Sequence, residues 1–138
     1  MYYRILCAAD LTEGSRRIVK KAWELANQFD AKLYLIHTVE PIPAYGYPGV
    51  TLIESPHIDE AKKHLKTLAE DFLIPEEQTS VVVGLPKTEI LKKAKELKID
   101  LIVVGSHGRH GISRLLGSTA NAVLHSSECD VVTVRYKS

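Results

Sequence analysis

At 138 residues the chain has the length of one domain of common size and is too short for two. Its 18 Lys and Arg against 17 Asp and Glu argue against a nucleic-acid or membrane-surface role driven by bulk charge. No apolar run approaches the ~18 residues of a membrane span. Cys7 and Cys129 stand beside or within apolar runs, as small core residues do, so we expect a soluble cytoplasmic protein without a disulfide framework.

Short apolar segments alternate with longer segments of helical period, which is the pattern of a parallel α/β sheet. In chain order we expect a strand at 3–9, a helix at 15–29, a strand at 32–39, a helix at 58–72, a strand at 79–84, a helix at 87–98, a strand at 100–105, a helix at 118–127 and a strand at 130–136. Right-handed crossovers would join these into one α/β domain over 1–138. That domain is an open, doubly wound five-stranded parallel sheet with helices on both faces.

Local signals support the helix assignments. The helix at 15–29 carries one apolar stripe that includes Ile18, Ala22 and Phe29. Ser55 as N-cap and Pro56 at the first helical position mark the start of the next helix.

The connection from Glu40 to Ser55 is long for a compact domain and holds Tyr45 and Tyr47. Such loops are often functional, and a surface excursion is the alternative. The connection follows the carboxyl end of a strand, so we expect it to fold toward a ligand bound there, with Tyr45 or Tyr47 covering that ligand.

Glycines gather after the fourth strand, at Gly105, Gly108, Gly111 and Gly117, which suggests a backbone shaped around a ligand. Asp10 follows the first strand, and open α/β sheets bind ligands beyond the carboxyl ends of their strands, where the strand order reverses. The loop ends at a helix amino terminus, which favours an anion such as phosphate. A tight strand-to-helix turn is the alternative for the glycines, and a helix N-cap or a solvated acid is the alternative for Asp10.

The segments "GSHGRHGISRLLGSTANAVL", "CAADLTEGS" and "CDVVTVR" resemble the universal stress protein A family, and the resemblance covers essentially the whole chain. It implies strand order 3-2-1-4-5, a homodimer, and an adenine nucleotide, ATP or a relative with or without Mg²⁺, at the reversal of strand order. By position, the resemblance places Ala8, Ala9 and Thr38 beside the adenine, Asp10 on the ribose, Val104 and Gly105 alongside, and Gly108, Gly117, Ser118 and Thr119 on the phosphates.

Two functions from different classes remain beside nucleotide binding. Only eight residues, 109 to 116, separate Gly108 from Gly117, one fewer than in nucleotide-binding members of the family. A nucleotide-independent stress-response dimer is therefore one alternative, and a slow ATPase is the other. Because the chain has neither a Walker A sequence nor a Gly-x-Gly-x-x-Gly fingerprint, we expect a regulatory module with little or no catalysis.

The histidines, the lysines at 87–98 and the last strand each allow one further prediction. His107 and His110 have no Cys or carboxylate set at metal-ligand spacing, so no metal site is expected. The lysines at 87, 92, 93, 95 and 98 alternate with glutamates, which is typical of a solvated helix face. The segment 130–136 would be an apolar edge strand, which favours pairing with a second copy of the chain.

Overall fold

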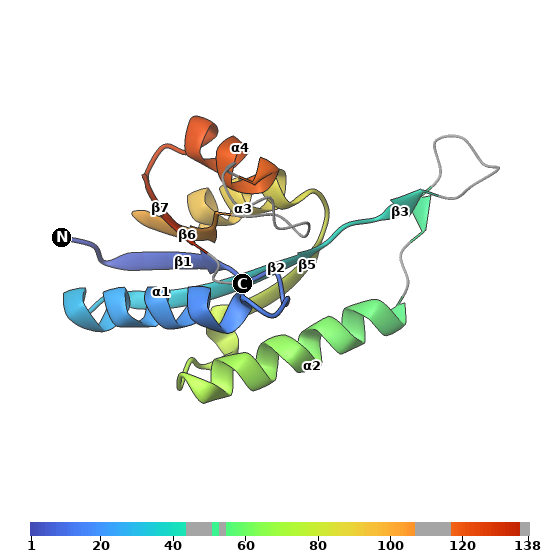
Figure 1. The fold of residues 1–138 in the computed structure, drawn as a ribbon, viewed down its shortest axis with the longest axis horizontal. Coiled ribbons are helices and arrows are strands. Elements are labelled where there is room, and N and C mark those ends of the chain that lie inside the picture. The colour runs from blue at the N-terminus through green and yellow to red at the C-terminus, as the bar shows by residue number, and fades with distance from the viewer. Residues whose placement is uncertain (44–50, 53–54, 107–116, 136–138) are drawn as a thin grey trace.

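The computed structural model describes residues 1–43, 51–52, 55–106 and 117–135 (Figure 1). Five parallel strands form its main sheet: β1 (Arg4–Ala8), β2 (Lys32–Val39), β5 (Thr79–Val83), β6 (Leu101–Gly105) and β7 (Asp130–Val134). Their order across the sheet is β5-β2-β1-β6-β7. With the five strands numbered along the chain this is 3-2-1-4-5, so the predicted topology and fold class are confirmed.

The helices cover the sheet in two pairs. The first pair is α1 (Ser15–Phe29) and α2 (Ser55–Asp71), and the second is α3 (Pro86–Glu96) and α4 (Ser118–Ser126). Figure 1 shows the two pairs on opposite faces of the sheet. Side chains alternate accordingly along β1: Ile5 and Cys7 belong to the cluster under α1 and α2, whereas Leu6 belongs to the cluster under α3 and α4.

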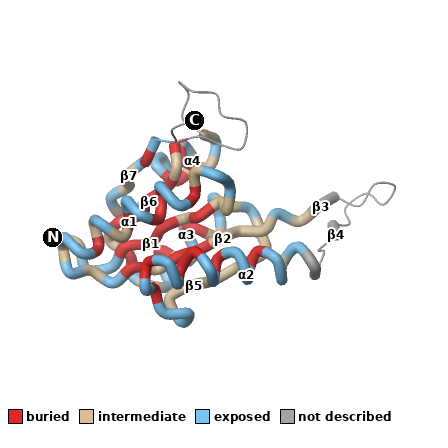
Figure 2. The backbone as a smooth tube through the Cα atoms, turned by 60° about the horizontal axis from the view of Figure 1, so that its bottom comes forward, coloured by how far each residue is buried: buried red, intermediate tan, exposed pale blue. Residues whose placement is uncertain are grey.

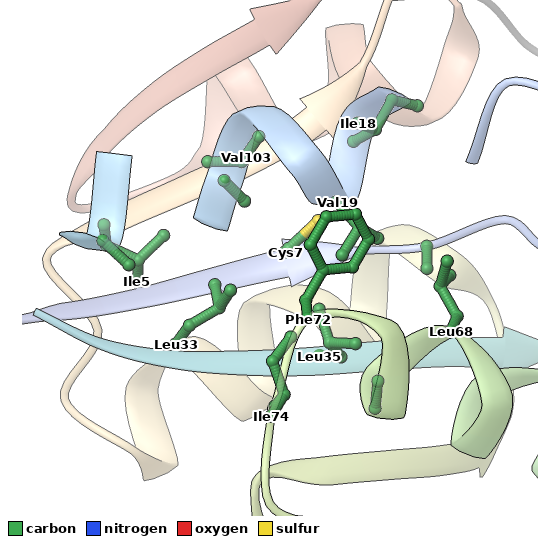
Figure 3. Packing of buried hydrophobic residues seen from close by; sticks show 14 of the residues in the cluster. Ile5, Cys7, Ile18, Val19, Leu33, Leu35, Leu68, Phe72, Ile74 and Val103 are labelled. Atoms are coloured by element: carbon green, nitrogen blue, oxygen red, sulfur yellow. The ribbon is translucent and has the colours of Figure 1, made fainter. Parts of the chain in front are cut away.

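Most residues of the central strands β1 and β6 are buried, as Figure 2 shows. Residues 101–104 of β6 are all buried, which accounts for the unbroken apolar run that a doubly covered strand requires. On the α1 and α2 face, Phe72 packs among Cys7, Val19 and Leu35 (Figure 3). The core therefore reaches from the central strands to the end of α2.

The connection from Glu40 to Ser55 contains structure that the sequence did not predict. Two short antiparallel strands, β3 (Ile42–Pro43) and β4 (Thr51–Leu52), pair with each other and project beyond the end of β2 (Figure 1). The 3-10 helix η1 (Glu76–Gln78) was not predicted either. Segments of two or three residues are too short to show a hydrophobic period, so pattern reading misses them.

Three helices end in the same way, with a residue other than glycine in the left-handed conformation. These residues are Asp30, Leu73 and Lys98, with φ angles of 53°, 55° and 54°. The amide that follows each donates to a carbonyl five residues earlier, from Ala31 to Ala26 (2.8 Å), Ile74 to Ala69 (2.9 Å) and Ile99 to Ala94 (2.8 Å). Ile74 and Ile99 are buried, so the turns at Leu73 and Lys98 each place an isoleucine in the core.

We predict that Leu73→Gly stabilises the protein. Leu73 is 89% exposed, so little packing is lost, while its left-handed backbone costs a Cβ-bearing residue about 1–2 kcal/mol. The more flexible unfolded chain offsets part of that gain, leaving roughly 0.5–1 kcal/mol in the free energy of unfolding. Urea denaturation measures it. Leu73→Ala is the control, because it removes the exposed side chain but keeps Cβ; an equal gain in both variants would contradict the backbone explanation.

Candidate functional site

The strand order reverses at β1. This strand pairs with β2 on one side and with β6 on the other. The chain leaves β1 for α1 on one face of the sheet and leaves β6 for α4 on the opposite face. Open α/β sheets bind ligands beyond the carboxyl ends of such a strand pair. The candidate site is therefore the edge of the sheet where β1 and β6 end.

The backbone that continues β1 is fixed to β2. Ala8 is the last residue of β1, and the Ala9 amide, in a residue only 3% exposed, donates to the carbonyl of Ile36 at 2.9 Å. The Ala9 carbonyl lies 2.6 Å from Nδ1 of half-buried His37, a hydrogen-bond distance. Sequence reasoning did not select His37. Its place one residue before Thr38, near the carboxyl end of β2, is the signal that could have indicated it.

Asp10 shapes a tight turn at the end of β1. Its Oδ1 accepts hydrogen bonds from the amide and the hydroxyl of Thr12, at 3.1 and 2.8 Å. The residue at the N-cap of α1 is Gly14, so Asp10 does not cap that helix, and the capping alternative is wrong. The turn holds the Asp10 carboxylate beside the carboxyl end of β1.

Leu11 adopts a strained backbone that the surrounding structure supports. Its φ is 58°, a left-handed value that is uncommon outside glycine. The Leu11 amide donates to Oγ of Ser15 at 3.1 Å, and Ser15 is only 2% exposed. Leu11 also packs against the core cluster under α1. Strain of this kind often accompanies a functional turn.

Cys7 lies close to this turn, but its thiol is unreactive. It is completely buried, and burial, together with the negative charge of Asp10, raises the pKa of its thiol. A thiol with a raised pKa stays protonated near neutral pH and is a poor nucleophile. Cys7 is therefore a core residue, as the sequence predicted.

The end of β6 forms a neck with the start of α4. Val104 is buried and Gly105 ends the strand. The Ser106 amide donates to Val134 at 2.8 Å, and the Ser106 carbonyl accepts from the Gly117 amide at 2.5 Å. Ser106 and Gly117 thus lie side by side, although ten residues separate them in the sequence. Gly108 lies between them in the sequence, outside the described residues.

Ser106 is the second residue that sequence reasoning did not place in the site. It is 7% exposed, and its Oγ has no hydrogen-bond partner among the described residues. A buried hydroxyl without a partner is costly, and its position directly after Gly105 puts it at the neck. The only feature of the sequence that could have indicated Ser106 as a site residue is that it directly follows a buried strand.

The amino terminus of α4 offers free donors beside the neck. The helix begins at Ser118, and Asn121 makes the first bond, to the carbonyl of Gly117 at 2.8 Å. The amides of Ser118, Thr119 and Ala120 precede that bond, and no side chain among the described residues caps them. These amides and the helix dipole favour an anion.

Nine of the ten predicted site residues thus lie in the described part of the chain, and the fold brings them to one end of the sheet. Ala8, Ala9 and Asp10 follow or end β1, Thr38 lies near the end of β2, Val104 and Gly105 end β6, and Gly117, Ser118 and Thr119 start α4. The Val104 side chain packs into the core under α3 and α4, so only its backbone can face a ligand. No group of three His, Cys, Asp or Glu that could hold a metal occurs in the parts of the chain that the structure covers.

A model of the Universal stress protein family matches residues 1–135. The chain belongs to this family. It is 48% identical over 141 aligned residues to Universal stress protein A homolog 2 of Coxiella burnetii, covering 99% of this chain and 97% of that protein. Across 1–43, 51–52, 55–106 and 117–135, no helix of this universal stress protein is long and apolar enough to cross a membrane.

Solved structures agree with this assignment. The protein UspA of Lactobacillus plantarum superposes with a TM-score of 0.77 at 26% identity, covering 97% of this chain and 98% of that one. A universal stress protein solved in complex with cAMP superposes with a TM-score of 0.68 at 27% identity, covering 97% of each chain.

We predict that Ser15→Ala destabilises the turn after β1. The substitution removes the acceptor of the Leu11 amide, and an unsatisfied buried donor costs about 1–3 kcal/mol. Chemical denaturation measures this loss, and amide hydrogen exchange shows faster exchange at Leu11. Ser126→Ala, at an exposed serine of α4, is the control and changes neither. Equal effects of the two substitutions would contradict the assigned role of Ser15.

Proposed function

We propose that this universal stress protein is a homodimeric stress-response module that binds ATP or another adenine nucleotide, with little or no catalysis. The observation that carries the proposal is the neck between Ser106 and Gly117. It joins the end of β6 to the amino terminus of α4, which no described side chain caps, and β6 is the neighbour of β1, the strand that Asp10 follows. Free amides and a carboxylate at one sheet edge suit phosphates and a ribose.

The residues at this edge fit a nucleotide. The Asp10 carboxylate would accept from ribose hydroxyls, and Ala8, Ala9 and Thr38 would border the adenine. The Gly117 amide already donates to Ser106, so the Ser118 and Thr119 amides and hydroxyls would take the phosphates, together with Gly108. Val104 and Gly105 would line the base of the site through their backbone. The buried Ser106 hydroxyl, which has no partner among the described residues, is suited to a polar ligand.

The relative solved with cAMP supports an adenine nucleotide as the ligand class. The bound nucleotide, with or without Mg²⁺, would add its charge and shape to this end of the sheet and would not react. Hydrolysis would further need a group that positions water and one that stabilises the transferred charge. A slow ATPase therefore remains an outcome of the test and not the proposal.

A nucleotide-independent dimer is the second candidate. One observation favours it: the spacing between Gly108 and Gly117 is one residue short, and the Gly117 amide already donates to the carbonyl of Ser106.

We expect the protein to act in the cytoplasm. Both cysteines are free, and Cys7 is fully buried, which suits a reducing compartment. Tyr45 and Tyr47, predicted to cover the ligand, lie outside the described residues, and that role stays a prediction.

We predict micromolar binding of Mg-ATP, measured by titration calorimetry. Asp10→Ala should weaken it about 10- to 100-fold, because a charged hydrogen-bond acceptor is lost. Gly117→Val should abolish it by crowding the neck. The φ and ψ of Gly117, −59° and 153°, are accessible to valine, so this variant should fold. Recovered nucleotide, analysed by mass spectrometry, should be intact ATP.

Glu77→Ala is the control for this experiment, because Glu77 is exposed and precedes β5 at the opposite end of the sheet. It removes one negative charge and should leave the affinity unchanged. Failure to bind at millimolar ATP would overturn the proposal and favour the nucleotide-independent dimer. Rapid release of phosphate, abolished by one side-chain substitution in the loop, would favour the enzyme.

The proposed dimer uses the free edge of β7. This strand ends the sheet, and among the described strands it pairs only with β6. Val134 accepts from Ser106, so its polar groups face β6. In a parallel ladder the neighbouring residue faces the other way, which turns the Thr133 amide outward. Two copies paired through this edge about a two-fold axis would satisfy such groups.

We predict that Thr133→Pro weakens the dimer at least about 10-fold, because proline removes the outward amide and blocks edge pairing. The bonds from β7 to β6 do not use that amide, so the fold should persist. Sedimentation velocity across a concentration series measures the dissociation constant. Thr133→Val is the control, since it keeps the amide. A monomer at high micromolar concentration in the unmodified protein would exclude the interface.

A further inference from the structure

A hollow lies at the other end of the sheet from the proposed nucleotide site. It has a volume of about 410 Å³, within the range of small-molecule pockets, and it lies between the carboxyl-terminal parts of α3 and α4. Its apolar lining comes from Leu91, Ala94 and Ile99. Ala94 and Ile99 are buried, so this part of the hollow is the surface of the core under α3 and α4.

Three lysines of α3 and its end line the hollow. Lys92, Lys95 and Lys98 follow one another at intervals of three residues, and all are exposed. None makes an ion pair with another described residue, whereas Lys93, which does not line the hollow, pairs with Glu96 at 3.6 Å. With Glu128 as the single acidic lining residue, the side chains of the hollow carry a charge of three minus one, or +2.

Stabilisation of helix carboxyl ends by cations does not explain the positions of all three lysines. Cations stabilise the carboxyl end of a helix, and this explains Lys95 in the last turn of α3. Lys92 precedes that turn. Lys98 follows the helix with a left-handed φ of 54°, a conformation that glycine adopts without strain.

The far wall of the hollow is a turn that is held by hydrogen bonds between Ser127 and Cys129. The Ser127 hydroxyl donates to the Cys129 carbonyl at 2.9 Å and accepts from the Cys129 amide at 3.1 Å. The Cys129 side chain is half-buried, and its Sγ lies 3.4 Å from Ser127 Oγ. The hollow thus combines a positive rim, an apolar floor and a fixed thiol.

We propose that the hollow between α3 and α4 binds a small organic anion with an aromatic or other apolar body. The carboxylate or phosphate of the ligand would lie among Lys92, Lys95 and Lys98, and the apolar body would cover Leu91, Ala94 and Ile99. Charge complementarity favours this occupant: a neutral apolar ligand would leave the lysine charges unmatched, and an inorganic anion would leave the apolar floor bare. The proposal does not depend on nucleotide binding at the other end of the sheet.

Cys129 provides the test, because Cys7 is fully buried and only Cys129 is accessible. Dithiobis(nitrobenzoate) is an aromatic disulfide with two carboxylates, and dithiodipyridine is a neutral aromatic disulfide. The Cys129 thiolate attacks one reagent sulfur, forms a mixed disulfide and releases the other half as a thiolate, which absorbs light. With the unmodified protein, the rate should saturate with the anionic reagent and rise linearly with the neutral one.

Lys92→Gln combined with Lys95→Gln should slow the anionic reagent about 10-fold, as expected from the loss of two nearby charges, and change the neutral reagent less than about 2-fold. Lys62→Gln combined with Lys66→Gln, at two exposed lysines of α2, removes the same charge elsewhere and should change neither rate. Cys129→Ser should abolish both reactions. Naphthyl phosphate should protect Cys129 from the neutral reagent, and naphthol should not.

Protection by naphthyl phosphate should persist in Asp10→Ala, which separates this hollow from the nucleotide site. Equal slowing by the two lysine pairs would overturn the proposal, because it would reflect only the charge of the whole protein. A rate that stays linear with the anionic reagent, or equal protection by naphthol, would also overturn it. A Cys129 that reacts with neither reagent would show that the hollow does not admit an aromatic group.

Discussion

The fold depends on one constraint, which is that every central strand must bury both of its faces. In β1, Ile5 and Cys7 require cover on one side, and Leu6 requires it on the other. Right-handed crossovers meet this requirement by sending α1 and α2 to one face and α3 and α4 to the other. The strand order must then reverse beside β1. The location of the candidate site is thus a consequence of how the core is covered.

At that reversal, the contacts that the structure describes are made largely by the main chain. The Ala9 carbonyl contacts His37, the Leu11 amide is held by Ser15, and Gly117 donates to Ser106. These contacts fix the backbone ends of two strands and one helix. A site built in this way suits binding, because preorganised amides need no reorganisation when an anion arrives. It also explains why our proposal assigns the nucleotide a regulatory role.

The two ends of the sheet offer positive charge by different means. At the amino terminus of α4, the free amides and the helix dipole supply it. At the carboxyl ends of α3 and α4, the dipoles have the opposite sign, so side chains must supply it, and Lys92, Lys95 and Lys98 do so. The proposed nucleotide site at the amino terminus of α4 and the proposed organic-anion site at the carboxyl ends of α3 and α4 should therefore differ in their sensitivity to single substitutions.

The sequence by itself determined the elements whose signal is local and periodic. The predicted ranges of α1 and β2, 15–29 and 32–39, match the structure, since apolar spacing there reports burial directly. The family resemblance implied the strand order, and with that order the sequence predicted that Asp10, after β1, and Gly105, at the end of β6, lie at one edge of the sheet. Roles of the individual site residues stay predictions.

Tertiary structure decided the rest, because those features depend on residues far apart in sequence or on single turns without a period. The bond from Gly117 to Ser106, the buried Ser15 under Leu11 and the left-handed Leu73 leave no mark in a hydrophobic pattern. The role of the lysines of α3 could not be predicted from the sequence pattern either. Their sequence predicts a solvated helix face, and only the packing of α4 beside α3 places three of them around a hollow.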